Sequence, residues 1–268
     1  MREGSEEESR MPTYTRASIQ AMLDHSVLVP SLTVEEARAA IRLGRDLGAK
    51  SCCVRPSDVL MAAEELSGSA TLVCTVIGFP HGSQCTAVKV CEATLACEQG
   101  AVELDMVLNI GRLRSGDDAY VAADIAAVVA VAHAAPRRAI VKVIMETAYL
   151  DDAQKARACA LIEGAGAEFA KTSTGFAVVT GDKAAGATLP DLRLMRAACG
   201  PGVEVKAAGG VRTLDALLAA AAAGATRIGC TATRAILEEF DARTAATGGV
   251  LTVAAEAGAA GSVAAAGY

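Results

Sequence analysis

Three of the chain's seven lysines interrupt short apolar segments that have the composition of buried strands. Lys142, Lys171 and Lys206 each lie in the later part of such a segment. A charged side chain buried in a parallel strand is costly unless it is paired, so each lysine alone is explained by a structural ion pair. Three of them in successive strands converge on one place if the strands close around an axis, which favours a functional interpretation. A buried amine near other cations has a lowered pKa, and a neutral amine in a dry pocket attacks carbonyls to form a Schiff base without metal or cofactor.

Carboxylates occur on the same set of segments. Glu103 and Asp105 are two residues apart and therefore share one face of their predicted strand. Asp24 lies on the first predicted strand, and Glu146 ends the fifth. Because barrels place their chemistry at the carboxyl ends of their strands, these carboxylates complete the candidate site around the lysines.

Glycine-rich segments follow the last three predicted strands and point to an anion. Segments 171–175, 208–212 and 227–231 contain Gly175, Gly209, Gly210 and Gly229, and Arg212 lies beside them. Each glycine alone is explained as a turn residue. Loops with free backbone N–H groups ahead of a helix cradle phosphate, so together they favour a phosphorylated substrate.

These residues require a fold that brings strand ends together, and the hydrophobic pattern supplies one. Short apolar segments alternate with longer segments of helical composition, which predicts parallel strands joined by helical crossovers. Eight such units predict a (β/α)8 TIM barrel in a single α/β domain. An open doubly wound sheet is the alternative, although neither GxGxxG nor GxxxxGK[ST] occurs. The predicted strands are 22–28, 51–54, 71–77, 102–108, 139–146, 168–173, 203–207 and 226–230, and the predicted helices are 34–47, 57–66, 83–99, 117–135, 151–164, 192–198, 214–223 and 232–240.

Composition narrows the class of partner. The chain has 268 residues, is 52% hydrophobic and carries a net charge of −6, which argues against nucleic acid or an anionic membrane as a partner. No apolar run is long enough to span a bilayer. Nine cysteines without a CxxC pair predict reduced thiols in a cytoplasmic protein. Cys85, Cys91 and Cys97 match no common zinc spacing and are expected to fill core.

The two ends of the chain differ in composition from the middle. Residues 1–16 are polar and charged, and we expect a mobile extension there. Residues 244–268 are rich in alanine and glycine and are expected to form a loosely held tail that ends at Tyr268. The barrel itself is therefore predicted to span residues 17–243.

At the positions described so far, the sequence resembles the 2-deoxyribose-5-phosphate aldolase family of class I aldolases. The resemblance is carried in order along the chain by segments 23–26, 73–82, 103–107, 141–147, 171–175 and 206–212, together with the terminal Tyr268. It implies a (β/α)8 barrel that reversibly cleaves 2-deoxy-D-ribose 5-phosphate to glyceraldehyde 3-phosphate and acetaldehyde in deoxyribonucleotide catabolism. It implies a cytoplasmic homodimer or homotetramer without a metal or other cofactor.

The resemblance also implies roles for individual residues. Lys171 corresponds to the Schiff-base lysine, Lys206 to the neighbouring cation that lowers its pKa, and Asp105 to the proton-relay carboxylate. The remaining residues implied are Asp24 and Lys142 as supporting groups, Gly175, Gly209, Gly210, Arg212, Gly229 and Thr231 at the phosphate, and Tyr268 in proton transfer at C2.

Two positions depart from the family pattern. The motif on the first strand ends in Ser26 instead of threonine, which keeps only the hydroxyl. Many members carry a serine pair where this chain has Thr231 and Ala232, which removes one possible donor to the phosphate. Two other functions stay open: a Schiff-base barrel aldolase for a different phosphorylated aldehyde, and a non-catalytic sensor of sugar phosphates.

Overall fold

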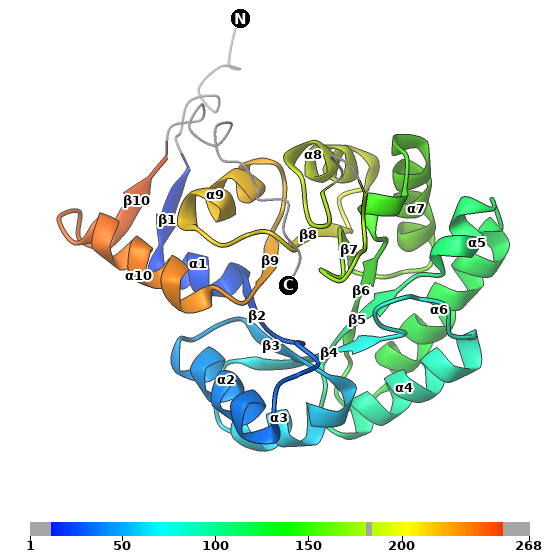
Figure 1. Cartoon of the computed structure of the whole chain (residues 1–268), viewed down its shortest axis with the longest axis horizontal. Helices are drawn as coiled ribbons and strands as arrows, with labels where there is room; N and C mark the ends of the chain where they lie inside the picture. Colours follow the sequence, from blue (N-terminus) through cyan, green and yellow to red (C-terminus); the bar gives the residue numbers. More distant parts are fainter. Residues whose placement is uncertain (1–11, 181–183, 254–268) are drawn as a thin grey trace, which may run out of the picture.

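Eight parallel strands close into a barrel in the computed structural model, which describes residues 12–180 and 184–253 (Figure 1). Each strand pairs with the next along the chain, and the last pairs with the first through Leu23 opposite Ile228 and Asp24 opposite Gly229. The predicted (β/α)8 barrel is confirmed, and the open sheet is excluded. In chain order the strands are β2 (Leu23–Val27), β3 (Ser51–Val54), β4 (Leu72–Ile77), β5 (Glu103–Val107), β6 (Ile140–Ile144), β7 (Phe169–Lys171), β8 (Glu204–Ala208) and β9 (Arg227–Cys230).

Helices follow the strands and cover the outside of the barrel. Several begin at a residue whose side chain accepts a hydrogen bond from a backbone N–H of the first turn; Thr33, Asp151, Thr188 and Thr213 all do so. The outer helices are α2 (Val34–Asp46), α3 (Val59–Glu65), α4 (Thr86–Glu98), α6 (Asp118–Ala134), α7 (Asp152–Gly164), α8 (Leu189–Ala198), α9 (Leu214–Ala222) and α10 (Thr233–Thr244).

Several short elements were not predicted from the sequence. A helix precedes the barrel and another follows β5, and two single 3₁₀ turns follow β3 and β6. Two three-residue strands pair antiparallel, with Tyr14 opposite Leu251, beside α10 (Figure 1). The added elements are β1 (Thr13–Thr15), α1 (Arg16–Met22), α5 (Ile110–Arg114), β10 (Val250–Thr252) and the turns Pro56–Asp58 and Thr147–Tyr149.

The two expected extensions therefore each supply one strand of this small sheet, between residues that the sequence offers no local reason to pair. Tyr268 and the rest of segment 254–268 lie outside the described residues, as do residues 1–11.

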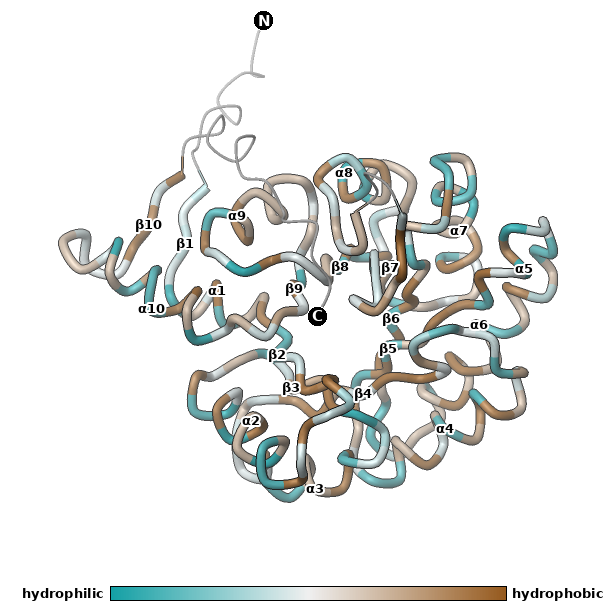
Figure 2. Tube along the Cα trace, in the orientation of Figure 1, coloured by the Kyte–Doolittle hydropathy of each residue, from teal (hydrophilic) through white to brown (hydrophobic). Residues whose placement is uncertain are grey.

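Hydrophobic residues recur along the barrel strands, and hydrophilic residues lie mainly on the outer helices (Figure 2). Every residue of β2, β3 and β5 is buried, as expected for parallel strands covered on both faces. Among the described helices, none has the length and apolar character needed to cross a membrane.

The expectation that Cys85, Cys91 and Cys97 fill core is wrong. Cys85 and Cys91 are exposed and Cys97 is half-buried. Cys85 precedes the first turn of α4, and residues six apart on a helix of 3.6 residues per turn do not share a face. All nine cysteines lie among the described residues and are unpaired.

Candidate active site

The three strand lysines point into the barrel and meet there. Lys142 on β6, Lys171 on β7 and Lys206 on β8 are 0%, 3% and 1% exposed. The register sets Lys171 directly opposite Lys206 and Lys142 directly opposite Asp105 of β5. The expected convergence of the three amines is therefore present.

Asp105 receives all three amines on one fully buried carboxylate. Lys142 donates to Oδ1 at 2.8 Å, while Lys171 and Lys206 each donate to Oδ2 at 2.7 Å. Burial alone would raise the pKa of this carboxyl, but the lysines outweigh burial and hold the pKa well below its usual range. Asp105 is therefore an ionised carboxylate at neutral pH, and it can accept a proton only when a neighbouring cation loses one.

A second layer of charges lies on the other side of the lysines. Lys206 Nζ is 2.5 Å from Asp24 Oδ2, and Lys142 donates to Glu103 Oε2 at 2.7 Å. Arg227 of β9 bonds both acids, with Nε 3.0 Å from Asp24 Oδ1 and Nη2 2.7 Å from Glu103 Oε2.

The pKa values of these groups follow from the pairing. Burial raises the pKa of a carboxyl, yet Lys206, Lys142 and Arg227 bring the pKa of Asp24 below its usual range. Burial lowers the pKa of an ammonium, yet Asp105 and Asp24 hold the pKa of Lys206 above its ordinary value. For Lys142 the same competition between burial and Asp105 leaves the pKa well above its ordinary value.

We call this group the charge cluster: the carboxylates of Asp24, Glu103 and Asp105 and the cations of Lys142, Lys171, Lys206 and Arg227. Lys142, Lys206 and Arg227 each contact at least two of the carboxylates. Lys171 contacts only Asp105 among the described carboxylates. With every group ionised, four positive charges face three negative ones.

Glycine-rich turns at the ends of β8 and β9 line one small hollow of about 30 Å³. Of the six residues expected at the phosphate, five line it: Gly209, Gly210, Arg212, Gly229 and Thr231. Gly175 lies next to them: a Cβ built on Gly209 would be 3.8 Å from the Cα of Gly175. Gly209 and Gly210 have φ of 80° and 88°, a region that suits glycine.

Glu146 contacts the loop that follows β7. It adopts a left-handed φ of 55°, which costs energy for a side chain of this kind. Its Oε2 accepts a hydrogen bond from the backbone N–H of Thr174 at 3.2 Å, and it also bonds the Thr174 hydroxyl. Burial raises the pKa of Glu146. Glu146 thus fixes the residue that precedes Gly175.

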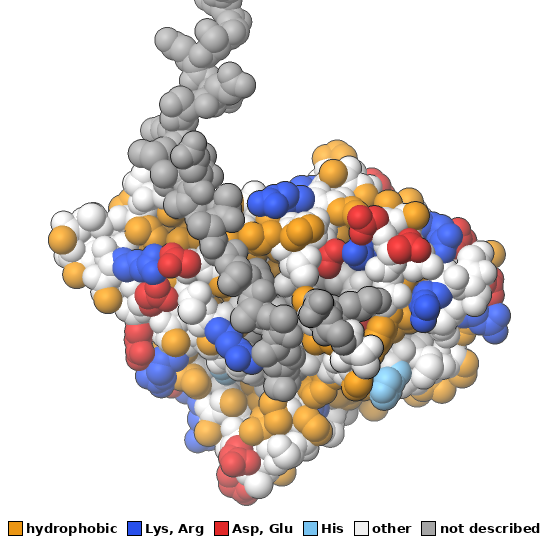
Figure 3. All heavy atoms as spheres, turned by 45° about the horizontal axis from the view of Figure 1, so that its top comes forward, with side chains coloured by type: hydrophobic (Ala, Val, Ile, Leu, Met, Phe, Trp, Pro, Cys, Tyr) orange, Lys and Arg blue, Asp and Glu red, His pale blue; other side chains and the backbone are white. Residues whose placement is uncertain are grey.

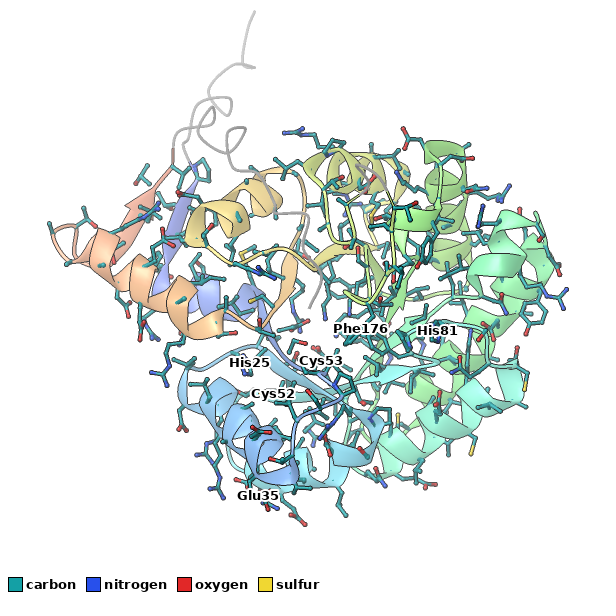
Figure 4. All side chains as sticks on the ribbon, viewed as in Figure 1. His25, Glu35, Cys52, Cys53, His81 and Phe176 are labelled. Carbon is teal, nitrogen blue, oxygen red and sulfur yellow. The ribbon has the colours of Figure 1, made fainter. Side chains whose placement is uncertain are left out.

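Further groups at the strand ends were not singled out from the sequence. Cys53 and Cys74 lie opposite each other on β3 and β4, and Figure 4 shows Cys53 near the barrel centre with Phe176 beside it. Phe176 packs edge-on against Phe79 with ring centroids 5.4 Å apart. A period-two pattern predicts which strand residues point inward, but the many inward thiols and apolar groups carry no chemical signature in sequence.

One group of side chains has the spacing for a metal ion. The ligand atoms of Cys53, Cys74 and Asp105 all lie within 4.8 Å of one another. Both oxygens of Asp105 already accept ammonium groups, which would repel a cation placed there. The residues present therefore fit an amine site better than a metal site.

On the face drawn in Figure 3, acidic and basic side chains are interspersed and form no continuous basic patch over the described residues. This face therefore lacks the continuous basic patch that is typical of surfaces that bind nucleic acid.

Comparison with known proteins gives a consistent result. Residues 17–239 match the model of the family described as DeoC/LacD family aldolase. The deoxyribose-phosphate aldolase of Listeria innocua is 48% identical over 220 residues, which cover 82% of this chain and 95% of that protein. The deoxyribose-phosphate aldolase of Bacillus cytotoxicus is 47% identical with the same coverage. The tetrameric deoxyribose phosphate aldolase from Aeropyrum pernix matches the structure with a TM-score of 0.77 and 29% identity, covering 85% of this chain and 93% of that one.

Proposed function

Because this chain belongs to the DeoC/LacD family of aldolases, and is therefore a carbon–carbon lyase, we propose that it cleaves 2-deoxy-D-ribose 5-phosphate. The products are D-glyceraldehyde 3-phosphate and acetaldehyde, and the reaction is reversible. Relatives that are 47–48% identical carry the name deoxyribose-phosphate aldolase, which supports this substrate. The observation that carries the mechanism is the charge cluster, with one lysine at its edge.

Lys171 is the nucleophile in this proposal. Its side chain is 4% exposed and lies at the last residue of β7, where substrate enters from the carboxyl end of the barrel. The charge cluster is neutral when one of its four cations has lost a proton. Lys171 contacts one carboxylate where the other cations contact two or more, and it lies at the carboxyl end of its strand, so it is the amine that we assign as the nucleophile.

The reaction begins with the formation of a Schiff base. Neutral Lys171 adds through Nζ to the aldehyde carbon C1 of the open-chain sugar, and loss of water leaves an iminium ion. A base removes the proton of the C3 hydroxyl, C2–C3 breaks, and its electron pair moves through C2 to the iminium nitrogen. Glyceraldehyde 3-phosphate departs, and the enamine is protonated at C2. Hydrolysis then releases acetaldehyde and frees Lys171.

Asp105 and Lys206 are suited to move these protons. Asp105 Oδ2 is shared by Lys171 and Lys206, so a proton released at one amine is within one hydrogen bond of the carboxylate that contacts the other. Such groups, with an ordered water, contribute about 10²–10⁴-fold each as general acids and bases. Asp24 and Lys142 support them by holding Lys206 and Asp105 in position.

The phosphate of the substrate occupies the glycine-lined hollow. Gly209, Gly210 and Gly229 bring backbone without side chains to this hollow, Gly175 lies beside it, and Arg212 adds positive charge. Thr231 supplies a hydroxyl at the rim of the same hollow. Tyr268 lies outside the described residues, and we propose on the family resemblance alone that its phenol assists proton transfer at C2.

Borohydride reduction in the presence of acetaldehyde tests the mechanism. Peptide mass mapping should find the reduced two-carbon adduct on Lys171 in the wild-type protein and none on the Lys171→Ala variant. An adduct on Lys142 or Lys206 would overturn the assignment of the nucleophile. A sensor of sugar phosphates would bind the substrate and give neither adduct nor product. A related aldolase for another aldehyde would give the adduct, but glyceraldehyde 3-phosphate would not appear from 2-deoxyribose 5-phosphate.

We further propose that the enzyme acts in the cytoplasm in the catabolism of deoxyribonucleotides. The absence of disulfides among its nine described cysteines fits a reducing compartment. We also propose a homodimer or homotetramer, since the relative from Aeropyrum pernix is described as a tetramer. Light scattering of the purified protein measures the oligomeric state directly.

A further inference from the structure

Arg227 lies beneath the reactive amines and was not assigned a function from the sequence. It is the first residue of β9, and its side chain is 7% exposed. Its guanidinium bonds Asp24 through Nε and Nη2 and Glu103 through Nη2, and it packs over the ring of Phe169 at 5.8 Å. One cation therefore joins the two carboxylates that hold Lys206 and Lys142.

Arg227 lies at the end of the barrel opposite the reactive strand ends. With Glu103 it lines a hollow of about 680 Å³ together with Lys50, Val102 and Ile140, which come just before or at the start of their strands. Substrate that reaches Lys171 from the carboxyl ends of the strands does not contact Arg227. Any effect of Arg227 on the reaction must pass through the charge cluster.

The charge of Arg227 is permanent, because a guanidinium keeps its proton at every pH that proteins tolerate. Of the four cations in the charge cluster, Arg227 is the one that cannot lose its proton to make the cluster neutral. Arg227, Lys142 and Lys206 together already balance the three carboxylates of the charge cluster, and the one carboxylate that contacts Lys171, Asp105, is shared with Lys142 and Lys206. Without Arg227, the same three carboxylates are neutralised only when Lys171 is protonated.

We infer that Arg227 is a positioning residue that keeps Lys171 available as a neutral nucleophile by neutralising Asp24 and Glu103 from below. This inference rests on the proposed Schiff-base function. The groups that face Arg227 or Lys171 inside the barrel are Asp24, Ser51, Cys53, Glu103, Asp105, Lys142, Glu146, Phe169 and Lys206. The charged residues that line the hollow beside Arg227 are Lys50, Arg137, Arg138, Glu168 and Glu204.

The test compares the pH dependence of kcat/KM and of borohydride trapping in Arg227→Met, Arg227→Lys and wild type. Arg227→Met should shift the acidic limb of both profiles toward higher pH by about one unit. The shift is modest because the lost positive charge acted on Lys171 only from a distance. Arg227→Lys keeps the charge and should restore most of the wild-type profile. KM at the alkaline plateau should stay within about twofold, since Arg227 does not touch the substrate.

A matched control separates this effect from lost stability. Lys89 is a fully buried cation whose Nζ lies 2.5 Å from Asp124 Oδ2, outside the charge cluster. Lys89→Met removes a buried positive charge just as Arg227→Met does, and it should leave the acidic limb in place. A folded Arg227→Met variant with an unmoved limb would overturn the inference.

Glu103→Gln gives an answer even where Arg227→Met does not fold. It removes one carboxylate from the charge cluster while keeping the shape of the side chain, so neutral Lys171 is favoured and the acidic limb should move downward. A merely structural role predicts no shift, or shifts of the same sign in both variants. If wild type itself gives no adduct on Lys171, the proposed function fails; if wild type gives the adduct and neither limb moves, only this inference fails.

Discussion

Replacing Lys206 by methionine tests directly whether neighbouring charge activates the nucleophile. Methionine keeps the length and much of the volume of the lysine stem while removing the ammonium. Lys206 Nζ contacts Asp24 and Asp105, and Lys171 Nζ contacts the same Oδ2 of Asp105. After the replacement, three carboxylates face Lys142, Arg227 and Lys171, so neutrality requires Lys171 to keep its proton.

The geometry sets the size of the effect. Lys171 Nζ and Lys206 Nζ each lie 2.7 Å from Asp105 Oδ2, and two donors on one oxygen are roughly 4–5 Å apart. Two unit charges at that distance repel by about 3–4 kcal/mol at an effective dielectric near 20. This corresponds to about two to three pH units as an upper bound, and relaxation of the charge cluster reduces it.

The assay is the pH profile of kcat/KM for cleavage of 2-deoxyribose 5-phosphate, followed by the release of glyceraldehyde 3-phosphate. We expect the midpoint of the acidic limb to shift by about one to two units toward higher pH, and activity to be partly regained at alkaline pH. Removing one partner of a buried pair costs about 3–5 kcal/mol, so thermal denaturation must accompany the kinetics. Lys89→Met serves again as the control for a lost buried cation.

An unmoved limb would refute the reasoning. If kcat falls by the same factor at every pH, Lys206 acts in proton transfer and not through its charge on Lys171. If the acidic limb shifts toward lower pH, our count of the charges in the cluster is wrong.

Three further predictions address the phosphate site, the tail and stability. Arg212→Ala should raise KM for 2-deoxyribose 5-phosphate about tenfold or more while leaving KM for unphosphorylated deoxyribose within about twofold, and equal effects would place Arg212 in a structural role. Deleting Tyr268 should slow exchange of acetaldehyde methyl protons with deuterated water while Schiff-base trapping stays intact; an unchanged exchange rate would assign Tyr268 no function. Burial lowers the pKa of His25 to about 4 from its ordinary value near 6.5, so the neutral ring contributes stability above pH 6.5 that is lost as the pH falls toward 4, up to about 3 kcal/mol. Urea denaturation of wild type and His25→Gln should show this loss in wild type alone.

The sequence predicts the barrel well because each strand and helix is specified by residues that are close together in the chain. The predicted strand 51–54 coincides with β3, and the other predicted strands contain nearly all of the observed residues. Helix starts such as Thr33 are visible because capping needs one side chain near its own backbone. The pairing of Tyr14 with Leu251 is not visible, since nothing near either residue specifies the other.

The candidate site divides in the same way. The convergence of Lys142, Lys171 and Lys206 follows from the order of the strands and from the alternation of inward and outward residues along each strand. Both can be predicted from the hydrophobic pattern. That all three bond one carboxylate does not follow, because it depends on the stagger of strands across the closed barrel. The sequence assigns no role to Arg227, the first residue of β9, because its contacts with Asp24 and Glu103 also depend on the stagger of the strands.

The imbalance of the charge cluster explains how a costly arrangement is kept. Burying seven ionisable groups is unfavourable unless each is paired, and an unpaired charge is worse than a neutral amine. With four cations for three carboxylates, one cation has no carboxylate of its own, and a neutral lysine in its place avoids an unbalanced buried charge. Lys171 is the one amine of the three with a single carboxylate partner, and it lies at the strand end that meets the mouth of the barrel. In the mechanism we propose, the charge imbalance that limits the stability of the barrel also leaves Lys171 as the reactive amine, and adding one carboxylate to this layer should stabilise the fold and reduce adduct formation on Lys171 together.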